Sequence, residues 1–401
     1  MIDSIRQQFN SAFTNELYQN YLSELNKAFP NSLDFRVAET PVFIDQFFTE
    51  KVLATGKYIT EQIQSSDFKA KTEASLLNQP NTFHESPLPK CILMDFAITK
   101  NEKNEMEPAL IELQGFPSLF AFELLQEEAF NKVYAMPNGF SPYLNGYTRE
   151  KYLAHLSEII KGVAGTNQHT VLLEILPHQQ KTRIDFYCTE KYFDIPIVCI
   201  TEIFQEGRYL FYERAGQKIK IDRIYNRIVL DELKNQTKAI QEKGAILQND
   251  IDVEWVTHPN HFFRISKFLM PFLTHTYIPK TQFVNELATI PNNLEDYILK
   301  PLFSFAGQGV IIDIQKGDIE KIAHPEHWIL QEKVHYAECI ATPTGPAKAE
   351  IRLFYFWDER TKKYIATMNL ARLSKGKMIG VDYNKTATWV GGSLAFFEQK
   401  N

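Results

Sequence analysis

The stretch that decides the fold is "YILKPLFSFAGQGV", residues 297–310. A β-strand pattern runs to Lys300 and Pro301, and a loop of aromatic and small residues then ends in Gly-Gln-Gly-Val. The chain has no Walker A motif, and Gly307-Gln308-Gly309 lacks the third glycine of a dinucleotide-binding loop. A strand lysine can still reach a phosphate as a point charge, and a glycine-rich hairpin can donate backbone N–H groups to it. An exposed lysine before an ordinary hairpin stays open as the alternative.

Size and composition describe a folded chain with a full apolar core. Of the 401 residues, 44% are hydrophobic and 23% are charged, which suits two or three ordinary domains or one composite enzyme. The formal net charge of −6 argues against a general nucleic-acid binder. No segment approaches the ~20 apolar residues that cross a bilayer, and no signal peptide is visible. We therefore expect a cytoplasmic protein without nucleic-acid or membrane partners, whose oligomeric state is unknown and whose cysteines are reduced core residues.

Apolar periodicity divides the chain into four segments. Residues 1–85 are expected to be mainly helical, and residues 86–165 to hold a strand hairpin and a helix starting near Pro117 and Ser118. Residues 166–250 contain a strand–helix–strand unit, which implies a short parallel sheet, and residues 251–401 combine a helix over 258–273 with further strands. The predicted strands lie at 90–98, 109–116, 169–176, 195–203, 297–301, 308–314, 327–334, 348–358 and 363–374.

Three of these strands carry polar residues in patterns that suit nucleotide or metal chemistry. Glu112 and Gln114 are two apart, so they share one strand face and form an oxygen pair suited to Mg²⁺. Glu350 and Arg352 also share a face, which fits a metal–phosphate site or a surface ion pair. Residues 331–334 end an apolar strand, where adenine can meet backbone N–H and C=O groups and a carboxylate can hold ribose hydroxyls. A plain exposed strand or strand end remains open for each of the three.

Two stretches near the C-terminus add candidate substrate contacts. Arg372 precedes a small polar turn with Lys375 and Lys377, and a guanidinium there can bind a carboxylate or phosphate through two N–H groups. Gly391 and Gly392 lie between apolar runs, which indicates a backbone that approaches a ligand closely. Both stretches favour a binding role for the end of the chain.

Taken in order, these stretches resemble the ATP-grasp ligases, and more closely the circularly permuted glutathione synthetases of the eukaryotic type. The matching stretches read "IELQ", "IDRIYNR", "RISKF", "ILKPLFSFAGQGV", "ILQEKV", "LARLSKG" and "VGGSLAFF". They cover residues from about 90 to 397, so roughly the first 80 residues carry little of the resemblance. The resemblance implies a mixed α+β and α/β chain. It would have an ATP-grasp-type fold of antiparallel sheets with helices, plus an inserted α/β substrate segment with a short parallel sheet.

The resemblance also implies a role for each matching residue. ATP would be held by phosphate-binding lysines, by the glycines of a covering loop and by an adenine and ribose pocket: Lys267 and Lys300; Gly307 and Gly309; Gln331, Glu332, Lys333 and Val334. Glu112 and Gln114 would coordinate Mg²⁺, with Glu350 as a candidate replacement ligand. Arg227 and Arg372 would orient substrate carboxylates in catalysis, and Asp95 matches an aspartate just upstream of the metal strand.

The chain departs from that family mainly where the peptide substrate binds. Ser304 stands near the place of a metal-binding glutamate in the loop after Lys-Pro. Leu93 lies near the place of an arginine before Asp95, and Pro117 and Leu119 stand where serines follow the metal strand. The ATP half is therefore better kept than the glutathione-precursor half.

The sequence thus predicts an ATP- and Mg²⁺-dependent carboxylate–amine ligase that forms an amide through an acyl-phosphate. Its partners would be a small-molecule acid and an amine, neither of which the sequence identifies. Two alternatives stay open: an ATP-grasp kinase, and a catalytically degenerate nucleotide-binding protein. The second follows from Ser304, because an expected acidic residue is missing there.

Overall fold

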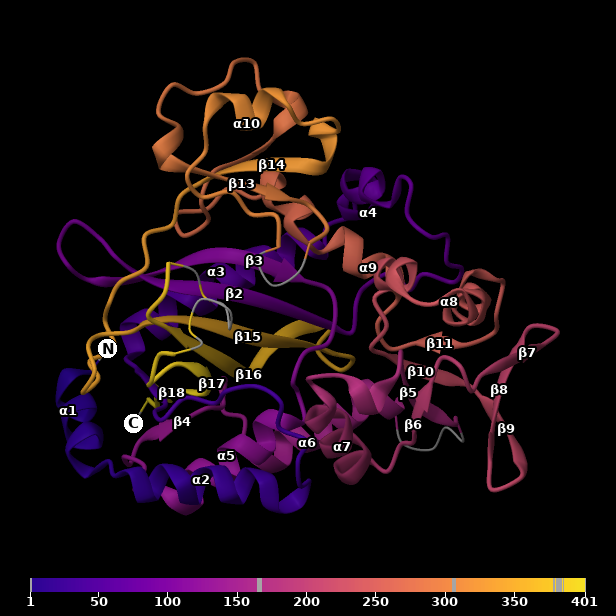
Figure 1. Cartoon of the computed structure of the whole chain (residues 1–401), viewed down its shortest axis with the longest axis horizontal. Coiled ribbons are helices and arrows are strands. Elements are labelled where there is room, and N and C mark those ends of the chain that lie inside the picture. The colour runs from indigo at the N-terminus through magenta and orange to yellow at the C-terminus, as the bar shows by residue number, and fades with distance from the viewer. Residues whose placement is uncertain are drawn as a thin grey trace.

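In the part of the chain that the structure describes, the fold consists of five sheets and the helices that cover them (Figure 1). The computed structural model describes residues 2–163, 168–304, 308–377, 379, 384 and 386–400. Several sheets are antiparallel and one is parallel, as expected for an α+β chain with an α/β segment. The division into four segments stays a prediction.

The largest sheet is antiparallel and has the strand order β17-β16-β15-β2-β3. Its bounds are β2 (Cys91–Lys100), β3 (Met106–Gln114), β15 (Lys348–Asp358), β16 (Lys363–Ser374) and β17 (Gly391–Ser393). The hairpin expected within residues 86–165 is confirmed as β2–β3, and the predicted strands at 348–358 and 363–374 pair as the hairpin β15–β16. The register of β2 against β3 shifts between Asp95 and Phe96, so Ile111 is the extra residue of a β-bulge and has no partner in β2.

A three-stranded antiparallel sheet lies above β3 at the top of Figure 1. It consists of β12 (Thr281–Phe283), β14 (Trp328–Glu332) and β13 (Tyr297–Pro301). The predicted strand at 308–314 is wrong, because only Ile311 forms a bridge, with Leu299. Ile314 instead enters the apolar cluster beneath α10 (Lys316–Glu320), and Gln315 with Asp318 forms a capping box that starts this helix. Of this β-branched run only Ile314 is buried, so the predicted strand is reduced to the single bridge at Ile311.

The four-stranded sheet β11-β10-β5-β6 is parallel, as the strand–helix–strand pattern predicts. A small antiparallel sheet, β7-β8-β9, projects beside it at the right of Figure 1. The elements of this region are β5 (Thr170–Glu174), η2 (Pro177–Gln179), α7 (Arg183–Phe193), β6 (Ile197–Cys199), β7 (Phe204–Glu206), β8 (Tyr209–Arg214), β9 (Gln217–Ile221), β10 (Arg223–Asn226), η3 (Leu230–Asn235), α8 (Lys238–Gly244), η4 (Ala245–Gln248) and β11 (Glu254–Trp255).

The N-terminal region is mainly helical, as expected, but its apolar periodicity hides a break. The helices α1 and α2 are separate because Thr14 caps the second, accepting a hydrogen bond from Leu17 N at 3.2 Å. A short sheet, β1-β18-β4, joins this region to the C-terminus. The bounds are α1 (Asp3–Ala12), α2 (Asn15–Ala28), β1 (Val42–Ile44), α3 (Gln46–Ile63), α4 (Phe68–Thr72), η1 (Glu73–Leu76), β4 (Phe140–Ser141) and β18 (Ala395–Glu398).

Two of the remaining helices differ from the sequence prediction in where they start or end. The helix expected near Pro117 is α5 (Phe122–Val133), whose first N–H groups bind a distant residue: Asp185 accepts from Ala121 N at 2.9 Å and Phe122 N at 3.0 Å. The helix expected at 258–273 splits after Arg264, where Ser266 caps a 3-10 helix. The bounds are α6 (Arg149–Lys161), α9 (Pro259–Arg264), η5 (Lys267–Phe272), η6 (Val284–Glu286), η7 (Leu294–Asp296) and η8 (Pro325–His327).

The main apolar core joins residues far apart in the chain. Tyr21 of α2, Phe130 of α5, Phe354 of β15 and Phe396 of β18 belong to one buried cluster. Cys91, Cys188 and Cys199 are buried free thiols and Cys339 is half-buried, close to the prediction of reduced core residues. Over the part of the chain that is described, no helix has the length and apolar character needed to span a membrane.

Gly391 tests whether the glycine pair serves a ligand or the fold. Its φ is +122°, and a Cβ there would lie 2.5 Å from the backbone oxygen of Arg36, so the close approach is to the chain itself. We expect Gly391→Ala to lower the free energy of unfolding by about 2–4 kcal/mol in urea denaturation. Gly317→Ala is the matched control, because a Cβ there meets nothing within 4 Å. Equal stabilities of the two variants would contradict this account.

Candidate functional site

Lys300 links the small sheet to the edge of the large one. It lies on β13, and its Nζ donates to Gln331 Oε1 at 2.7 Å and to Ile111 O of β3 at 3.2 Å. Ile111 is the bulge residue, which has no partner in β2. The residue is only 6% exposed. The opening stretch is therefore not an exposed lysine before a hairpin: its lysine is buried and held between two sheets.

Lys267 brings a second ammonium group to the same place. It is the first residue of η5, and its Nζ donates to Ser304 O at 2.7 Å and lies 3.3 Å from Glu112 Oε1. Lys267 Nζ also lies 3.4 Å from Ser304 Oγ, so the residue that stands near the expected loop acid contacts a lysine predicted to bind phosphate. Two lysines from different elements thus converge beside one carboxylate, Glu112.

Burial sets the electrostatics of this pair. It lowers the pKa of Lys300 to about 8, and the neighbouring Lys267 acts in the same direction, while Glu112 opposes both. At neutral pH a proton on Lys300 is therefore held weakly. A bound anion beside the two ammonium groups would relieve the repulsion between them.

A network of carboxylates and guanidiniums covers the face of the large sheet. Arg352 binds both oxygens of Asp95 at 2.6 Å, and Arg372 Nη2 donates to Asp95 Oδ2 at 2.8 Å and to Glu350. The register explains the contacts, because Asp95 lies opposite Glu112 and Arg352, and Glu350 lies opposite Arg372. The predicted shared face of Glu350 and Arg352 is confirmed by these pairs.

The protonation states follow from this network. Burial pushes the pKa of Asp95 upward, but Arg352 and Arg372 more than offset it and hold the pKa below its usual range. Burial raises the pKa of Glu350 although Arg372 acts against it, and Tyr336 Oη donates to Glu350 Oε2 at 2.7 Å. Burial next to Glu350 also raises the pKa of Tyr336, so its hydroxyl stays protonated.

The predicted metal ligands differ in how well they fit Mg²⁺. Glu112 and Gln114 lie on one face of β3, and an acid oxygen with an amide oxygen is a suitable donor set. Glu350 fits poorly as folded, because Arg372 and Tyr336 engage both of its oxygens. Within the described ranges, no three His, Cys, Asp or Glu side chains form a metal-binding group. The assignment of Glu112 and Gln114 stays a prediction.

The predicted adenine strand ends where the small sheet meets the site. Gln331 is fully buried and joins Lys300 to Thr281, whose Oγ1 accepts from Gln331 Nε2 at 2.9 Å. Glu332 accepts from Lys280 N, Lys333 N donates to Asp296 O, and Val334 is half-buried. Gly309 has a φ of +72°, as a turn glycine should, whereas Gly307 lies outside the described residues. An adenine pocket here remains a prediction.

Arg227 lies near Arg352, because both arginines contact Ser118, and not near Arg372. Arg227 Nη1 donates to Ser118 O at 2.6 Å, and Arg352 Nη1 donates to Ser118 Oγ at 3.2 Å. Asp185 lies 3.7 Å from Arg227. Sequence reasoning noted Arg352 for its alternation with Glu350 but gave it no role, and it missed Tyr336 and Thr281. Only their long-range contacts identify these two residues.

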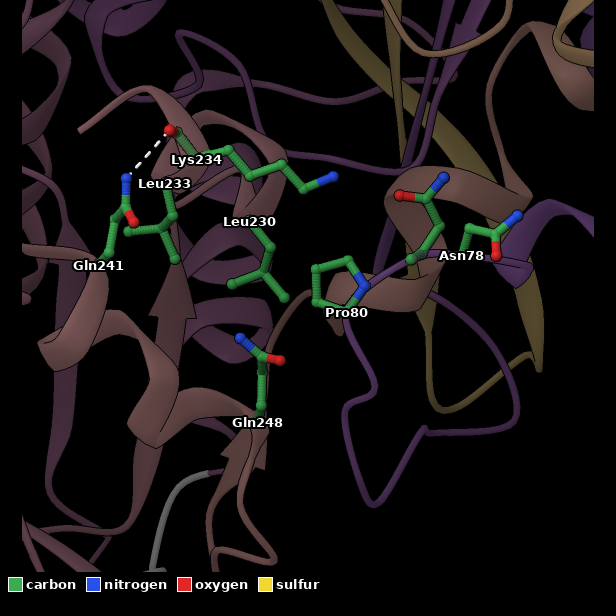
Figure 2. Close-up of a pocket in the computed structure, with 8 residues that line it drawn as sticks. Asn78, Pro80, Leu230, Leu233, Lys234, Gln241 and Gln248 are labelled. Carbon is green, nitrogen blue, oxygen red and sulfur yellow. Dashed lines mark hydrogen bonds between the residues drawn. The ribbon is translucent and has the colours of Figure 1, made fainter. Parts of the chain in front are cut away.

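Two surface cavities are lined by residues that do not belong to this site. One of about 530 Å³ is lined by His84, Lys90, Lys220, Asp222 and Trp255, among others. The other, of about 360 Å³, has leucines from η3 and amide side chains around it: Leu230, Leu233, Asn78, Gln241 and Gln248 (Figure 2). Neither includes a residue that the sequence predicts to bind ATP or metal.

Comparison with known proteins gives the class of fold. The structure is similar to that of a glutathione synthetase-like effector from Globodera pallida in its apo form. The TM-score is 0.56 at 10% sequence identity, over 96% of this chain and 97% of the other. No protein-family model and no curated protein sequence matches the chain. The likeness therefore concerns the fold alone, which is similar to that of this effector.

The pKa of Lys300 gives the first test of the site. Between pH 8 and 10 the unfolded chain keeps a proton at Lys300 that the folded chain loses, so stability rises with pH there. This contribution amounts to about 2 kcal/mol and should be absent from Lys300→Met. Below pH 8 both states carry the proton and the folded state bears the full cost of burying it.

The measurement is urea unfolding of both proteins at pH 8 and pH 10. Other groups titrate equally in the two proteins, so the difference between their stabilities isolates Lys300. A difference that does not change with pH would show that burial leaves this lysine unperturbed.

Proposed function

We propose that this chain is an ATP- and Mg²⁺-dependent carboxylate–amine ligase of the ATP-grasp type. The observation that carries the proposal is the convergence of Lys267 and Lys300 beside Glu112, between β13 and β3. Two partly desolvated ammonium groups suit a polyphosphate, which offers negative oxygens to both. The fold of a glutathione synthetase-like protein supports the proposal, because the sequence carries the motifs of such ligases in order.

The reaction would proceed in two steps. A carboxylate oxygen of the acid attacks the γ-phosphorus of ATP, the bond to the β,γ-bridging oxygen breaks, and acyl-phosphate and ADP form. The amine nitrogen then attacks the acyl carbon, phosphate leaves, and the nitrogen loses a proton. The protein mainly positions the reactants and balances charge, because the transferring phosphoryl group carries most of it.

Each group of residues has a part in this scheme. Lys267 and Lys300 would bind the phosphates, and Arg227, near Arg352 at Ser118, would orient the acid. Glu112 and Gln114 would hold Mg²⁺, which neutralises phosphate charge when bound. Arg372 is engaged by Asp95 and Glu350, so it would meet the substrate with its remaining N–H groups.

One observation favours the alternative of a degenerate nucleotide-binding protein. Glu350 is engaged by Arg372 and Tyr336, and Ser304 bonds to Lys267, so neither residue replaces the expected loop acid as folded. Amide formation with ADP release over a panel of acids and amines would establish the ligase. A phosphorylated acid as the final product would establish a kinase instead. Nucleotide binding without turnover would establish the degenerate protein.

Replacement of either lysine should abolish nucleotide turnover. We expect Lys267→Met and Lys300→Met each to lower ADP release at least about 100-fold, because each removes a preorganised positive charge from the phosphates. Lys316→Met is the matched control. It removes a lysine from α10, next to the same small sheet, but the side chain of Lys316 is 70% exposed. Full activity in either lysine variant would refute the assignment of that lysine to the phosphates. Circular dichroism checks that both variants fold.

Nucleotide binding should also take up protons. At pH 8 Lys300 is about half protonated when free, and a phosphate beside it favours the charged form, so uptake approaches about half a proton per ATP. Titration calorimetry in two buffers of different ionisation enthalpy measures this number. The Lys300→Met variant, if it still binds, should show less uptake; an equal value would assign the proton to another group.

A further inference from the structure

The ATP-site lysine Lys267 depends on a segment that the resemblance does not cover. Residues 68–86, which we name the strap, comprise α4, η1 and the chain up to Ser86. They run along α9, the short helix that ends three residues before Lys267. Three linked residues span at most ~10 Å, so a displacement of the end of α9 is transmitted to Lys267.

Arg264 is the centre of the contact between the strap and α9. It is 3% exposed, and its guanidinium donates to Glu85 Oε1 at 2.8 Å and Oε2 at 3.2 Å. It also donates to Lys69 O at 3.0 Å, to Thr72 Oγ1 at 3.2 Å and to Glu73 Oε2 at 2.8 Å. One buried side chain therefore binds four residues of the strap.

Asn260 of α9 and His258, the N-cap residue just before the helix, repeat the pattern. Asn260 Nδ2 donates to Glu85 Oε2 at 2.9 Å, and its Oδ1 accepts from Thr82 Oγ1 at 2.7 Å. His258 Nε2 lies 2.9 Å from Phe83 O. Glu85 thus joins Arg264 to Asn260, and these hydrogen bonds hold its pKa at about 2 despite the opposing effect of burial.

The other side of α9 packs against the end of β3, the strand that carries Glu112 and Gln114. A Cβ on Gly115, the residue after β3, would lie 2.3 Å from His261 O, and Gly115 N donates to Ile265 O at 2.8 Å. The helix is therefore fixed between β3 and the strap. The same strand β3 carries Glu112, whose carboxylate contacts Lys267 Nζ. By holding α9 against β3, the strap therefore controls how closely Lys267 approaches Glu112.

We propose that Glu85 is a positioning residue for the nucleotide site: through Arg264 it holds α9 so that Lys267 Nζ faces the phosphates. The proposal rests on the proposed function only for the phosphates. It gives residues 68–86 a task, although the motifs of the family begin after them. Glu85 itself contacts neither Lys267 nor Glu112 among its hydrogen bonds and ion pairs.

The first experiment needs no ligand. Acetic anhydride labels lysines, and mass spectrometry measures the rate at each one. Lys267, with 7% of its side chain exposed, should be labelled at least about fivefold faster in Glu85→Gln than in the wild type. Lys51 of α3, whose Nζ donates to Glu107 of β3, should keep its rate. An unchanged Lys267 rate, or an equal rise at Lys51, would overturn the proposal.

Glu73→Gln is the matched control, because Glu73 binds the same guanidinium but its side chain is 69% exposed. An exposed pair contributes little, so this variant should label like the wild type. If circular dichroism shows that Glu85→Gln does not fold, Glu85→Asp takes its place; it keeps the charge and shortens the side chain by one methylene. The same outcomes then apply to it.

The second experiment measures the effect on the nucleotide by a double-mutant cycle. Glu85→Gln should raise the Kd for ATP at least about fivefold in the wild-type background and leave it unchanged in Lys267→Met. Equal effects in both backgrounds would mean that the strap acts on stability alone and would overturn positioning. If the wild type binds no ATP, the proposed function fails, and the labelling rates still support or overturn the strap.

Discussion

The contact of Lys300 with two sheets is the constraint on which the site depends. A buried ammonium is costly unless it finds acceptors, and here they come from Gln331 on its own sheet and Ile111 on the other. The bulge at Ile111 places a residue without a partner in β2 at the edge strand. The small sheet is therefore held over the large one by a group whose burial also weakens its hold on a proton.

Charge balance supports the proposal that the site binds an anion. Four cationic groups, those of Lys267, Lys300, Arg352 and Arg372, lie near three carboxylates, those of Asp95, Glu112 and Glu350. Asp95 and Glu350 are paired with the two arginines. Such buried ion pairs fix the geometry of the side chains more than they add to the stability of the fold. Glu112 then faces both lysines alone. The excess positive charge falls where the phosphates are proposed to bind.

The sequence predicts what local patterns encode. Apolar strand segments separated by polar turns give the hairpins β2–β3 and β15–β16, and the strand–helix–strand pattern gives the parallel sheet. It fails at three places. The distant Asp185 binds the N–H groups that start α5, and the local cap Ser266 divides the helix before Lys267. The run at 308–314 forms one bridge and buries Ile314 instead of pairing as a strand. For the site, the strand positions of Lys300 and Glu112 are readable. The Asp95–Arg352 pair joins residues 257 positions apart, which no local period reveals.

The same reasoning explains why the N-terminal region has no motif and still bears on the site. A residue that touches a substrate is constrained by the chemistry of that substrate, so its type and spacing recur. The strap touches α9 through backbone oxygens of Lys69 and Phe83 as well as through side chains, and backbone contacts leave little mark on a sequence. On the facing helix α9, these contacts require one long side chain with a planar, multiply donating cationic group, which is Arg264. The resemblance read from the motifs therefore begins only after the part of the chain that holds one of its lysines in place.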